Sequence, residues 1–267
     1  MVGLYIFPSL LSSRTQLHLL TQLFHRDLSN PAHQTNLHMH YNIPYPPSSS
    51  EQPKSFFSPE AQCLVFDPKD PTVHNPLSTT QVLNKKLRWM TLGGQYDWTQ
   101  KVYPSTQPPP FPADVAQLIE GLFPAMKAQA AIFNLYSPGD TLSLHRDVSE
   151  ECNRPLVSIS LGCEGIFVVG LDGDCNAKTD GGGGQGTTAV TIRLRSGDAV
   201  VMSGVARTAW HSIPQVIAGT CPTWMEDWPC TLSAVHGGDE YENEYEHWKG
   251  WMKGKRINLN VRQMWDS

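Results

Sequence analysis

The sequence lacks three features that would assign its 267 residues to common classes of protein. No apolar run approaches the roughly twenty residues that a helix needs to cross a bilayer, so we expect no membrane segment. No CxxC pair occurs, which removes the usual zinc-site spacing. The GxxxxGK[ST] pattern of a phosphate-binding loop is also missing, and the glycine run at 181–184 predicts a hairpin loop instead.

Positive charge is scarce as well. The chain has 20 Lys and Arg against 25 Asp and Glu, which gives a formal net charge of -5 at pH 7. Phosphate contacts need local Lys and Arg, so this balance argues mildly against tight binding of nucleic acid. The basic residues nevertheless form two local clusters. These are Lys85, Lys86 and Arg88, and Lys249, Lys253 and Lys255.

Six cysteines are scattered along the chain without a regular spacing. They are Cys63, Cys152, Cys163, Cys175, Cys221 and Cys230. In a chain of this length an even count does not imply disulfides, and we expect reduced thiols in an intracellular compartment. The sequence leaves nucleus, cytoplasm and mitochondrion open.

The N-terminal segment contains no acidic residue in its first 26 positions, which is also the pattern of a transit peptide. However, Leu17, Leu20 and Phe24 recur at helical spacing. Ser12 or Ser13 can cap that helix. We therefore interpret the segment as structural, and the sequence leaves open whether the natural protein begins further upstream.

Beyond residue 130 the sequence predicts many short strands. Runs of strand length and pattern occur at 132–136, 141–147, 156–161, 166–171, 189–194, 198–202 and 256–262. A proline cluster at 108–112 introduces one helix, whose apolar stripe predicts packing on a sheet. Short strands joined by turns favour a sandwich or jelly roll. We expect one structural domain overall: a mainly β (α+β) core at 113–267 with flanking helices, and an N-terminal helical extension, residues 1–112, packed on it.

The predicted strand at 256–262 alternates strictly. One face carries Ile257, Leu259 and Val261, and the other carries Arg256, Asn258, Asn260 and Arg262. Two guanidiniums and two amides on one strand face suit a dianion, because Arg presents a fixed fork that matches a carboxylate. The alternative interpretation is a solvent-facing strand on which the arginines are incidental.

A candidate metal site lies at His145-Arg146-Asp147, with His211 further along the chain. Residues two apart in a strand point to the same face, so His145 and Asp147 can aim at one point. His211 completes a set of two imidazoles and one carboxylate if its strand lies alongside. Such a set suits a non-haem Fe(II) that keeps positions open for oxygen and a co-substrate. In the alternative interpretation the HxD motif arises by chance and His211 is an ordinary packed histidine.

Two other polar pairs are candidates for ligand binding. Asn134 and Tyr136 share one face of a predicted strand. Their amide and phenol can hydrogen-bond a ligand carboxylate, or equally satisfy the interior of a barrel. His38 and His40 form a pair that could bind metal, although the sequence suggests no third ligand.

The stretch at 214–255 predicts a long insertion before the last strand. It holds Trp224, Trp228, Trp248 and Trp251. These rings either stack on nucleic-acid bases or pack in the core. An acidic run at 239–246 predicts a solvated surface.

Taken together, these motifs resemble the AlkB family of Fe(II)/2-oxoglutarate-dependent dioxygenases. The resemblance rests on the order and spacing of Asn134-x-Tyr136, His145-x-Asp147, His211 and Arg256-x-Asn258-x-Asn260-x-Arg262. Stretches at 87–93, 196–204, 226–228 and 261–263 resemble the subgroup of the first animal AlkB homologue. The similarity runs from about Gly3 to Gln263 and implies the double-stranded β-helix of the family, which is a jelly roll.

The resemblance implies the metal and the reaction. Fe(II) is expected to be held by His145, Asp147 and His211, with 2-oxoglutarate and molecular oxygen as co-substrates. 2-Oxoglutarate is converted to succinate while a methyl group on a base is oxidised, and an N-hydroxymethyl product then loses formaldehyde.

The resemblance also implies the ligands of 2-oxoglutarate. Arg256 is expected to pair with the distal carboxylate of the co-substrate. Asn134 and Tyr136 assist it. Asn258 and Arg262 are expected to steady the end of the co-substrate near the metal.

The expected substrate is a methylated base in DNA or RNA, with methyladenine favoured and transfer-RNA methylcytosine as the alternative. Such a base would be single-stranded, looped or flipped out of a duplex. The resemblance places the nucleotide-recognition region within residues 1–112. Trp89, Ser149 and Glu150 are the expected substrate residues. We expect a monomer with no protein partner.

The chain departs from the family pattern at two places. Asn260 stands where the last strand usually carries Thr, and it still faces the pocket and can hydrogen-bond. Ser149 and Glu150 stand where bacterial members often read HxDxD. The base preference of the bacterial enzyme is therefore not carried over.

Two rival functions stay open at this point. The same iron chemistry could act on a protein side chain or on a small molecule. Alternatively, the barrel is a cupin-like binding module without catalysis. The intact set of metal ligands favours an enzyme over such a module.

Overall fold

The computed structural model of the chain describes residues 1–46, 55–97, 99–100, 102–104, 107–171, 189–230 and 244–266. Its strands are β1 (Leu4–Phe7), β2 (Val65–Phe66), β3 (Leu77–Ser78), β4 (Trp89–Gly93), β5 (Ala130–Tyr136), β6 (Leu142–His145), β7 (Leu156–Gly162), β8 (Gly165–Gly170), β9 (Ala189–Leu194), β10 (Ala199–Met202), β11 (Trp210–Val216) and β12 (Arg256–Arg262). Its helices are α1 (Ser13–Thr21), α2 (Thr79–Gln81), α3 (Ala113–Leu122) and α4 (Thr223–Glu226), with the helical turns η1 (Gln22–Asp27), η2 (Asn36–Met39), η3 (Pro59–Cys63), η4 (Val82–Lys86), η5 (Gly204–Thr208), η7 (Glu246–Trp248) and η8 (Trp251–Gly254).

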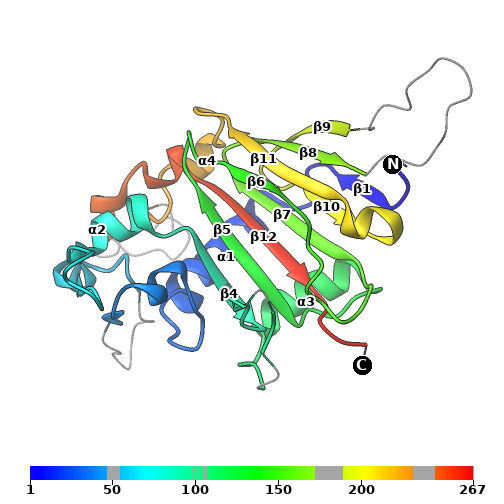
Figure 1. The fold of residues 1–267 in the computed structure, drawn as a ribbon. Helices are drawn as coiled ribbons and strands as arrows, with labels where there is room; N and C mark the ends of the chain where they lie inside the picture. Colours follow the sequence, from blue (N-terminus) through cyan, green and yellow to red (C-terminus); the bar gives the residue numbers. More distant parts are fainter. Residues whose placement is uncertain are drawn as a thin grey trace, which may run out of the picture.

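Two antiparallel sheets form the core of the described structure (Figure 1). The larger sheet has the strand order β1-β10-β7-β12-β5-β4, and the smaller has the order β6-β11-β8-β9. Helices α1 and α3 lie behind the larger sheet in Figure 1. An apolar cluster that includes Leu156 of the larger sheet and Phe167 of the smaller joins their inner faces. The jelly-roll core predicted from the sequence is confirmed.

The strands predicted beyond residue 130 are all present, with one correction. The strand expected at 141–147 ends at His145, so Asp147 lies in the loop that follows β6. The insertion expected from residue 214 begins slightly later, because β11 continues to Val216.

The N-terminal extension is part of the larger sheet. Strand β1 pairs with β10 at one edge, and β4 pairs with β5 at the other. A boundary at residue 112 therefore does not separate the extension from the core sheet. Between these strands, α1 begins where the Ser12 side chain accepts a hydrogen bond from the Thr15 N–H, as the sequence predicted.

An aromatic layer joins the extension to the outer face of the larger sheet. The Phe24 ring lies 5.0 Å from Phe133 of β5 and 5.1 Å from Trp251. Trp228 and Trp248 pack in the same layer, and both are nearly inaccessible to solvent. Each such ring contributes roughly 1.5–3 kcal/mol through burial. These three tryptophans therefore pack in the core, and base stacking is excluded for them.

Strand β12 has two buried faces. Its apolar face packs on the helical layer as predicted. Its polar face is buried as well, since Arg256, Asn258 and Arg262 are only 0%, 5% and 3% exposed. The solvent-facing interpretation of this strand is wrong, because β8 and the loop after β6 cover its polar face.

His38 has a structural role. Its Nδ1 accepts a hydrogen bond from the Thr35 N–H at 2.9 Å, and its Nε2 lies 2.9 Å from the Tyr45 hydroxyl. Both ring nitrogens of His38 are therefore used in holding η2, so the metal-binding alternative for the pair with His40 is wrong for His38.

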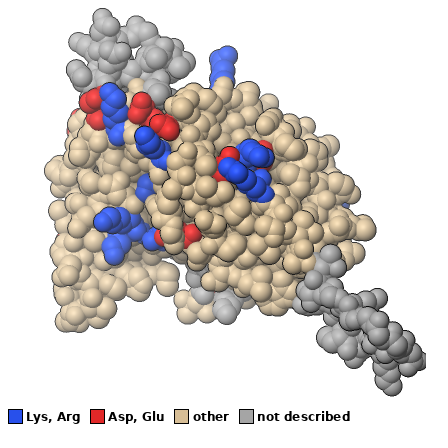
Figure 2. All heavy atoms as spheres, turned by 90° about the horizontal axis from the view of Figure 1, so that it is seen from above, with Lys and Arg blue, Asp and Glu red and all other residues tan. Residues whose placement is uncertain are grey.

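The two basic clusters of the sequence adjoin each other, because Lys255 Nζ donates to the Asn84 carbonyl at 2.7 Å. Three basic residues of these clusters form ion pairs with acidic side chains: Arg88 with Asp140, Lys249 with Glu246 and Lys253 with Glu226. Figure 2 shows one face of the molecule, on which charged side chains form a few separate groups in a largely uncharged surface. This face presents no continuous basic surface of the kind that tight duplex binding requires.

Some sequence features fall outside the described residues. These are the glycine run at 181–184, Cys175 and the acids at 239–243 of the acidic run. The five described cysteines are free thiols. No helix in the described ranges combines the length and apolarity needed to cross a bilayer.

Candidate metal centre

Strands β6 and β11 bring the predicted metal ligands together. They pair antiparallel with His145 opposite His211, and the centroids of the two imidazole rings are 4.2 Å apart. The Asp147 carboxylate lies 3.9 Å from His145 Nε2 and 4.0 Å from His211 Nε2. The donor atoms of all three residues lie within 4.8 Å of one another. The predicted set is therefore assembled, although a loop rather than a strand positions Asp147.

Backbone carbonyls orient both imidazoles. Nδ1 of His145 lies 2.9 Å from the Ser143 carbonyl, and Nδ1 of His211 lies 3.0 Å from the Ala209 carbonyl. A carbonyl only accepts, so each Nδ1 carries the proton and each Nε2 presents a lone pair. Second-shell bonds of this kind fix the tautomer of metal-binding histidines. Both Nε2 atoms face the Asp147 carboxylate.

Charge at the centre favours metal binding. Burial disfavours ionisation of Asp147, but the positive charge of Arg262 and the two histidines outweigh it, so the pKa of Asp147 lies below its ordinary value. Burial lowers the pKa of His211, with Asp147 opposing the shift. At neutral pH the centre therefore offers an ionised carboxylate and a neutral His211 ring, which are the forms that bind a divalent cation.

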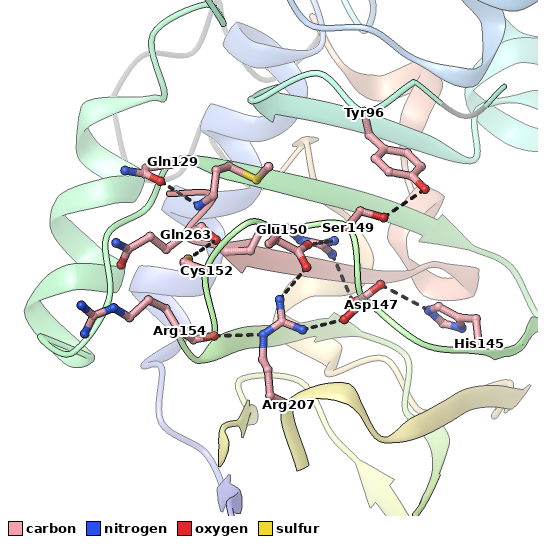
Figure 3. Close-up of polar contacts among 12 residues, drawn as sticks. Tyr96, Gln129, His145, Asp147, Ser149, Glu150, Cys152, Arg154, Arg207 and Gln263 are labelled. Atoms are coloured by element: carbon pink, nitrogen blue, oxygen red, sulfur yellow. Dashed lines mark hydrogen bonds and ion pairs between the residues drawn. The ribbon is translucent and has the colours of Figure 1, made fainter. Parts of the chain in front are cut away.

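A buried ion-pair network holds the loop that carries Asp147 (Figure 3). Arg262 donates to Asp147 Oδ2 at 3.3 Å and to Glu150 Oε1 at 2.8 Å. Arg207 of η5 donates to the Asp147 carbonyl at 2.9 Å and to Glu150 Oε2 at 2.8 Å. Its Nε also donates to the Arg154 carbonyl at 2.9 Å. Two guanidiniums thus fix both the main chain and the side chain of Asp147.

Glu150 does not lie where a substrate residue would. Its side chain is 2% exposed and forms ion pairs with Arg207 (Figure 3) and with Arg262. Both carboxylate oxygens are engaged in these pairs, so Glu150 neutralises the guanidiniums and positions the loop. The expectation that Glu150 contacts substrate is corrected accordingly.

Arg256, at the other end of β12, is held differently. It is fully buried and donates to the Cys163 carbonyl at 3.2 Å and to Ser160 Oγ at 3.0 Å. No carboxylate among the described residues lies within ion-pair distance of it, and burial lowers its pKa to about 10. The guanidinium packs on Gly165, where an added Cβ would lie 2.6 Å from Arg256 Nε. Arg256 therefore remains charged at neutral pH, and it forms no ion pair with a described residue.

Two buried polar groups at this end of β12 have no hydrogen-bond partner among the described residues. These are Arg256 Nε and the hydroxyl of Tyr136, which is directly opposite Arg256 across β5 and β12. Burial raises the pKa of Tyr136. Asn134 pairs in the same way with Asn258, whose amide donates to Ser158 Oγ at 2.7 Å. Asn134, Tyr136, Arg256 and Asn258, four of the residues predicted to bind the co-substrate, therefore share one inner face.

Trp89 and Ser149 are both connected with a hollow at the surface of the protein. Trp89 is opposite Asn134 across β4 and β5, and it lines a hollow of about 240 Å³ together with Tyr96. Ser149 Oγ donates to the Tyr96 hydroxyl at 3.4 Å (Figure 3). This contact connects the hollow with the segment that carries the metal ligands.

Three residues of the site were missed by sequence reasoning. Arg207 belongs to no motif; its only signal is an arginine between the apolar residues that precede His211. Gly165 is one of many glycines, and only its distance to Arg256 distinguishes it. Tyr96 follows the predicted strand at 87–93 by three positions, and its contact with Ser149 depends on the folded loop.

A family model described as the 2OG-Fe(II) oxygenase superfamily matches residues 3–262. A protein of Pyricularia oryzae named N6-methyladenosine RNA demethylase ALKB1 is 50% identical, over 98% of this chain and 74% of that protein. The chain belongs to the AlkB family of 2OG-Fe(II) oxygenases.

Other AlkB-family relatives carry different substrate names. The tRNA demethylase abh1 of Schizosaccharomyces pombe is 34% identical, over 98% of this chain and 79% of that protein. Human nucleic acid dioxygenase ALKBH1 is 31% identical over 81% of this chain and 54% of that protein. The solved structure of OsALKBH1 has a TM-score of 0.56 at 16% identity, over 98% of this chain and 96% of that chain. This last likeness supports the AlkB fold.

Fe(II) and 2-oxoglutarate are the groups that the superfamily name implies, and the residues of this AlkB-family chain fit both. Two imidazole Nε2 atoms and one carboxylate form the donor set of open-sided Fe(II) sites. The unpartnered Arg256 Nε and Tyr136 hydroxyl suit a ligand carboxylate.

Proposed function

We propose that this enzyme removes methyl groups oxidatively from bases in nucleic acid, with N6-methyladenine in RNA as the favoured substrate. The observation that carries the oxygenase chemistry is the buried Arg256 of the larger sheet, which packs on Gly165 of the sheet that carries His145 and His211 and has no described carboxylate within ion-pair distance. A ligand with a carboxylate at one end is suited to bridge these two places. The names of the two relatives that are 50% identical support the choice of N6-methyladenosine in RNA.

We assign the metal ligands to His145, Asp147 and His211. Bound Fe(II) supplies the oxygen activation that couples conversion of 2-oxoglutarate to succinate with oxidation of the methyl group. The protein orients the two Nε2 lone pairs through the carbonyls of Ser143 and Ala209. Arg262 and Arg207 hold the aspartate in place.

We assign the distal carboxylate of 2-oxoglutarate to Arg256, with Tyr136 and Asn134 beside it. A carboxylate there would receive hydrogen bonds from Arg256 Nε and the Tyr136 hydroxyl, which are otherwise unpartnered. Asn258 and Arg262 are assigned to the end of the co-substrate near the metal. Arg262 already pairs with two acids, so its part is chiefly to position Asp147.

We assign the methylated base to the hollow beside Trp89, Tyr96 and Ser149. An aromatic wall suits a base that has left its stack. Paired charges in both basic clusters favour a single-stranded or looped substrate, since little free charge remains for duplex phosphates. Transfer RNA is the second candidate, supported by the name of the fission-yeast relative.

We propose further that the enzyme acts as an intracellular monomer without a protein partner. The free thiols of the five described cysteines support a reducing compartment. Size-exclusion chromatography with light scattering tests the monomer, and any concentration-independent dimer overturns it.

The test is a panel of oligonucleotides incubated with Fe(II), 2-oxoglutarate and oxygen, and read by mass spectrometry. It contains N6-methyladenosine in RNA, N6-methyldeoxyadenosine in DNA and methylated transfer RNA, with a methylated histone peptide as comparison. Loss of methyl from RNA, absent in His145→Ala, supports the proposal. Activity on the peptide alone favours the protein-oxygenase alternative. Failure to bind any divalent metal favours the binding module without catalysis.

A further inference from the structure

A second hollow lies beside the one that holds Trp89. Its volume is about 220 Å³, and Gln34, Gln95 and Pro104 line both hollows. Tyr96 lines only the first and Tyr103 only the second, and their ring centroids are 5.1 Å apart. The two hollows are therefore neighbours, with this pair of tyrosines between them.

Both tyrosines adjoin the metal centre. The Tyr96 hydroxyl accepts a hydrogen bond from Ser149, two residues beyond Asp147. Burial raises the pKa of Tyr103, and the nearby positive charge of Arg262 opposes the rise. A substrate that occupies the first hollow can therefore extend into the second.

The lining of the second hollow matches a neutral planar group. None of the described residues that line it carries a charge. It offers the aromatic rings of Tyr103 and Trp265, the amide of Gln107 and the rings of Pro108 and Pro109. Aromatic faces and amides are the means by which proteins hold unstacked bases, whereas phosphates or acidic peptides require cations. The volume is below the roughly 300–1,000 Å³ of pockets for drug-sized ligands, which suits a single base.

Hydrogen bonds hold the main chain of Trp265 in place. Its N–H and the N–H of Met264 donate to Gln129 Oε1 at 3.0 and 2.7 Å. Its carbonyl accepts from Gln263 Nε2 at 2.7 Å. Trp265 is half-buried and lies just beyond the end of β12, so its ring lines the second hollow from an ordered main chain.

We propose that the second hollow binds the base next to the methylated one in a single-stranded substrate, with this neighbouring base stacked on Trp265. The inference rests on the proposed function, and it names an oligonucleotide rather than a free nucleotide as the substrate. Gln34 and Gln107 lie where their amides can meet the edge of the neighbouring base. The enzyme should then favour an oligonucleotide over the same methylated base alone.

The experiment compares two substrates, a single-stranded RNA pentanucleotide with central N6-methyladenosine and N6-methyladenosine 5′-monophosphate. Trp265→Ala should raise KM for the pentanucleotide about tenfold, the loss expected for one base–aromatic stack, with kcat nearly unchanged. Activity on the monophosphate should not change. Gln107→Ala should act in the same direction and more weakly. Trp224→Ala is the control, because Trp224 is an exposed tryptophan on α4 that lines neither hollow.

Pentanucleotides with an abasic position on either side of the methylated base provide an independent arm. With the wild-type enzyme, one of these two abasic pentanucleotides should have a higher KM than the intact pentanucleotide. With Trp265→Ala, the abasic and intact pentanucleotides should have the same KM. The inference is overturned if KM for the pentanucleotide is unchanged in both Trp265→Ala and Gln107→Ala. It is also overturned if Trp265→Ala loses activity equally on the pentanucleotide and the monophosphate. Either result leaves the proposed function standing. A wild type that demethylates neither substrate overturns the proposed function, and the inference with it.

Discussion

Arg256 and Arg262 stand at the two ends of strand β12, both buried, yet their charges are balanced in opposite ways. Arg262 lies between the carboxylates of Asp147 and Glu150, and these charges raise its pKa despite its burial. Arg256 contacts only a carbonyl and a hydroxyl, and burial lowers its pKa to about 10. A buried charge is tolerated when it is paired, and an unpaired one destabilises the fold.

The two arginines on this strand face have different roles. The charge of Arg262 is used within the protein, because it fixes the aspartate of the metal centre. Arg256 forms no ion pair with a described carboxylate, and in the proposed function a ligand carboxylate pairs with it. If the proposed function is correct, the strand carries one arginine that positions Asp147 and one that binds the co-substrate.

The largest expected effect is on stability without ligands. Arg262→Met should lower the free energy of unfolding by about 3–5 kcal/mol, because it leaves Asp147 and Glu150 buried with less compensating charge. Arg256→Met should change it by less than about 1 kcal/mol, or stabilise the protein, since no buried acid loses its partner. Urea unfolding of the metal-free proteins measures both. Equal losses in the two variants would erase the distinction.

Glu150→Gln should have the next largest effect. The amide keeps the shape of the side chain but removes the charge between Arg207 and Arg262. We expect a loss of about 2–3 kcal/mol, the range for hydrogen bonds to charged groups. The matched control is Glu151→Gln, an exposed neighbour, which should stay within about 0.5 kcal/mol of wild type. A stable Glu150→Gln protein with altered substrate affinity would instead support substrate contact.

Acid should act on one arginine variant and not on the other. The pKa of Asp147 lies below its ordinary value of 3.8, so the folded wild type gains stability from this group above that pH and loses it as pH falls. In Arg262→Met the carboxylate loses that support, and the deficit against wild type should be largest at neutral pH and shrink below about pH 4. The difference between Arg256→Met and wild type should stay constant from pH 3 to 7. Urea unfolding across this range checks the slopes, and parallel slopes for both variants contradict the account.

Gly165→Ala should give the smallest effect, confined to the Arg256 end. The added Cβ would lie 2.6 Å from Arg256 Nε, so the guanidinium must move while its charge remains. We expect the Kd of 2-oxoglutarate to rise about tenfold, which corresponds to about 1.4 kcal/mol, with metal affinity unchanged. Gly121→Ala in α3 has nothing within 4 Å of its Cβ and serves as the control. Unaltered 2-oxoglutarate binding in Gly165→Ala would show that the close packing of Gly165 on the Arg256 guanidinium is not needed.

Local patterns in the sequence predict most of this site. The strict alternation of β12 and the spacing of His145 and Asp147 follow from the two-residue period of strands. The same patterns could not show whether the polar face of β12 is buried. That face is covered by β8, which belongs to the other sheet and reaches β12 only when the two sheets pack together. They also could not show that β1 and β4 complete the larger sheet, since both pairings join residues far apart in the chain.

Glu150 shows the limit most clearly. Its position three residues after Asp147 made substrate contact a reasonable prediction. Its direction depends on Arg207, which is 57 positions away in sequence and meets it only in the folded loop. The sequence predicts which residues gather near the metal, whereas long-range packing decides which of them face the ligand.

Calorimetric titration of 2-oxoglutarate into Mn(II)-loaded protein without oxygen tests the central claim most directly. If the charge of Arg256 is matched by the co-substrate, Arg256→Met should still bind Mn(II) but bind 2-oxoglutarate at least about 100-fold more weakly than wild type. An Arg256→Met protein that binds 2-oxoglutarate as wild type does would contradict the account.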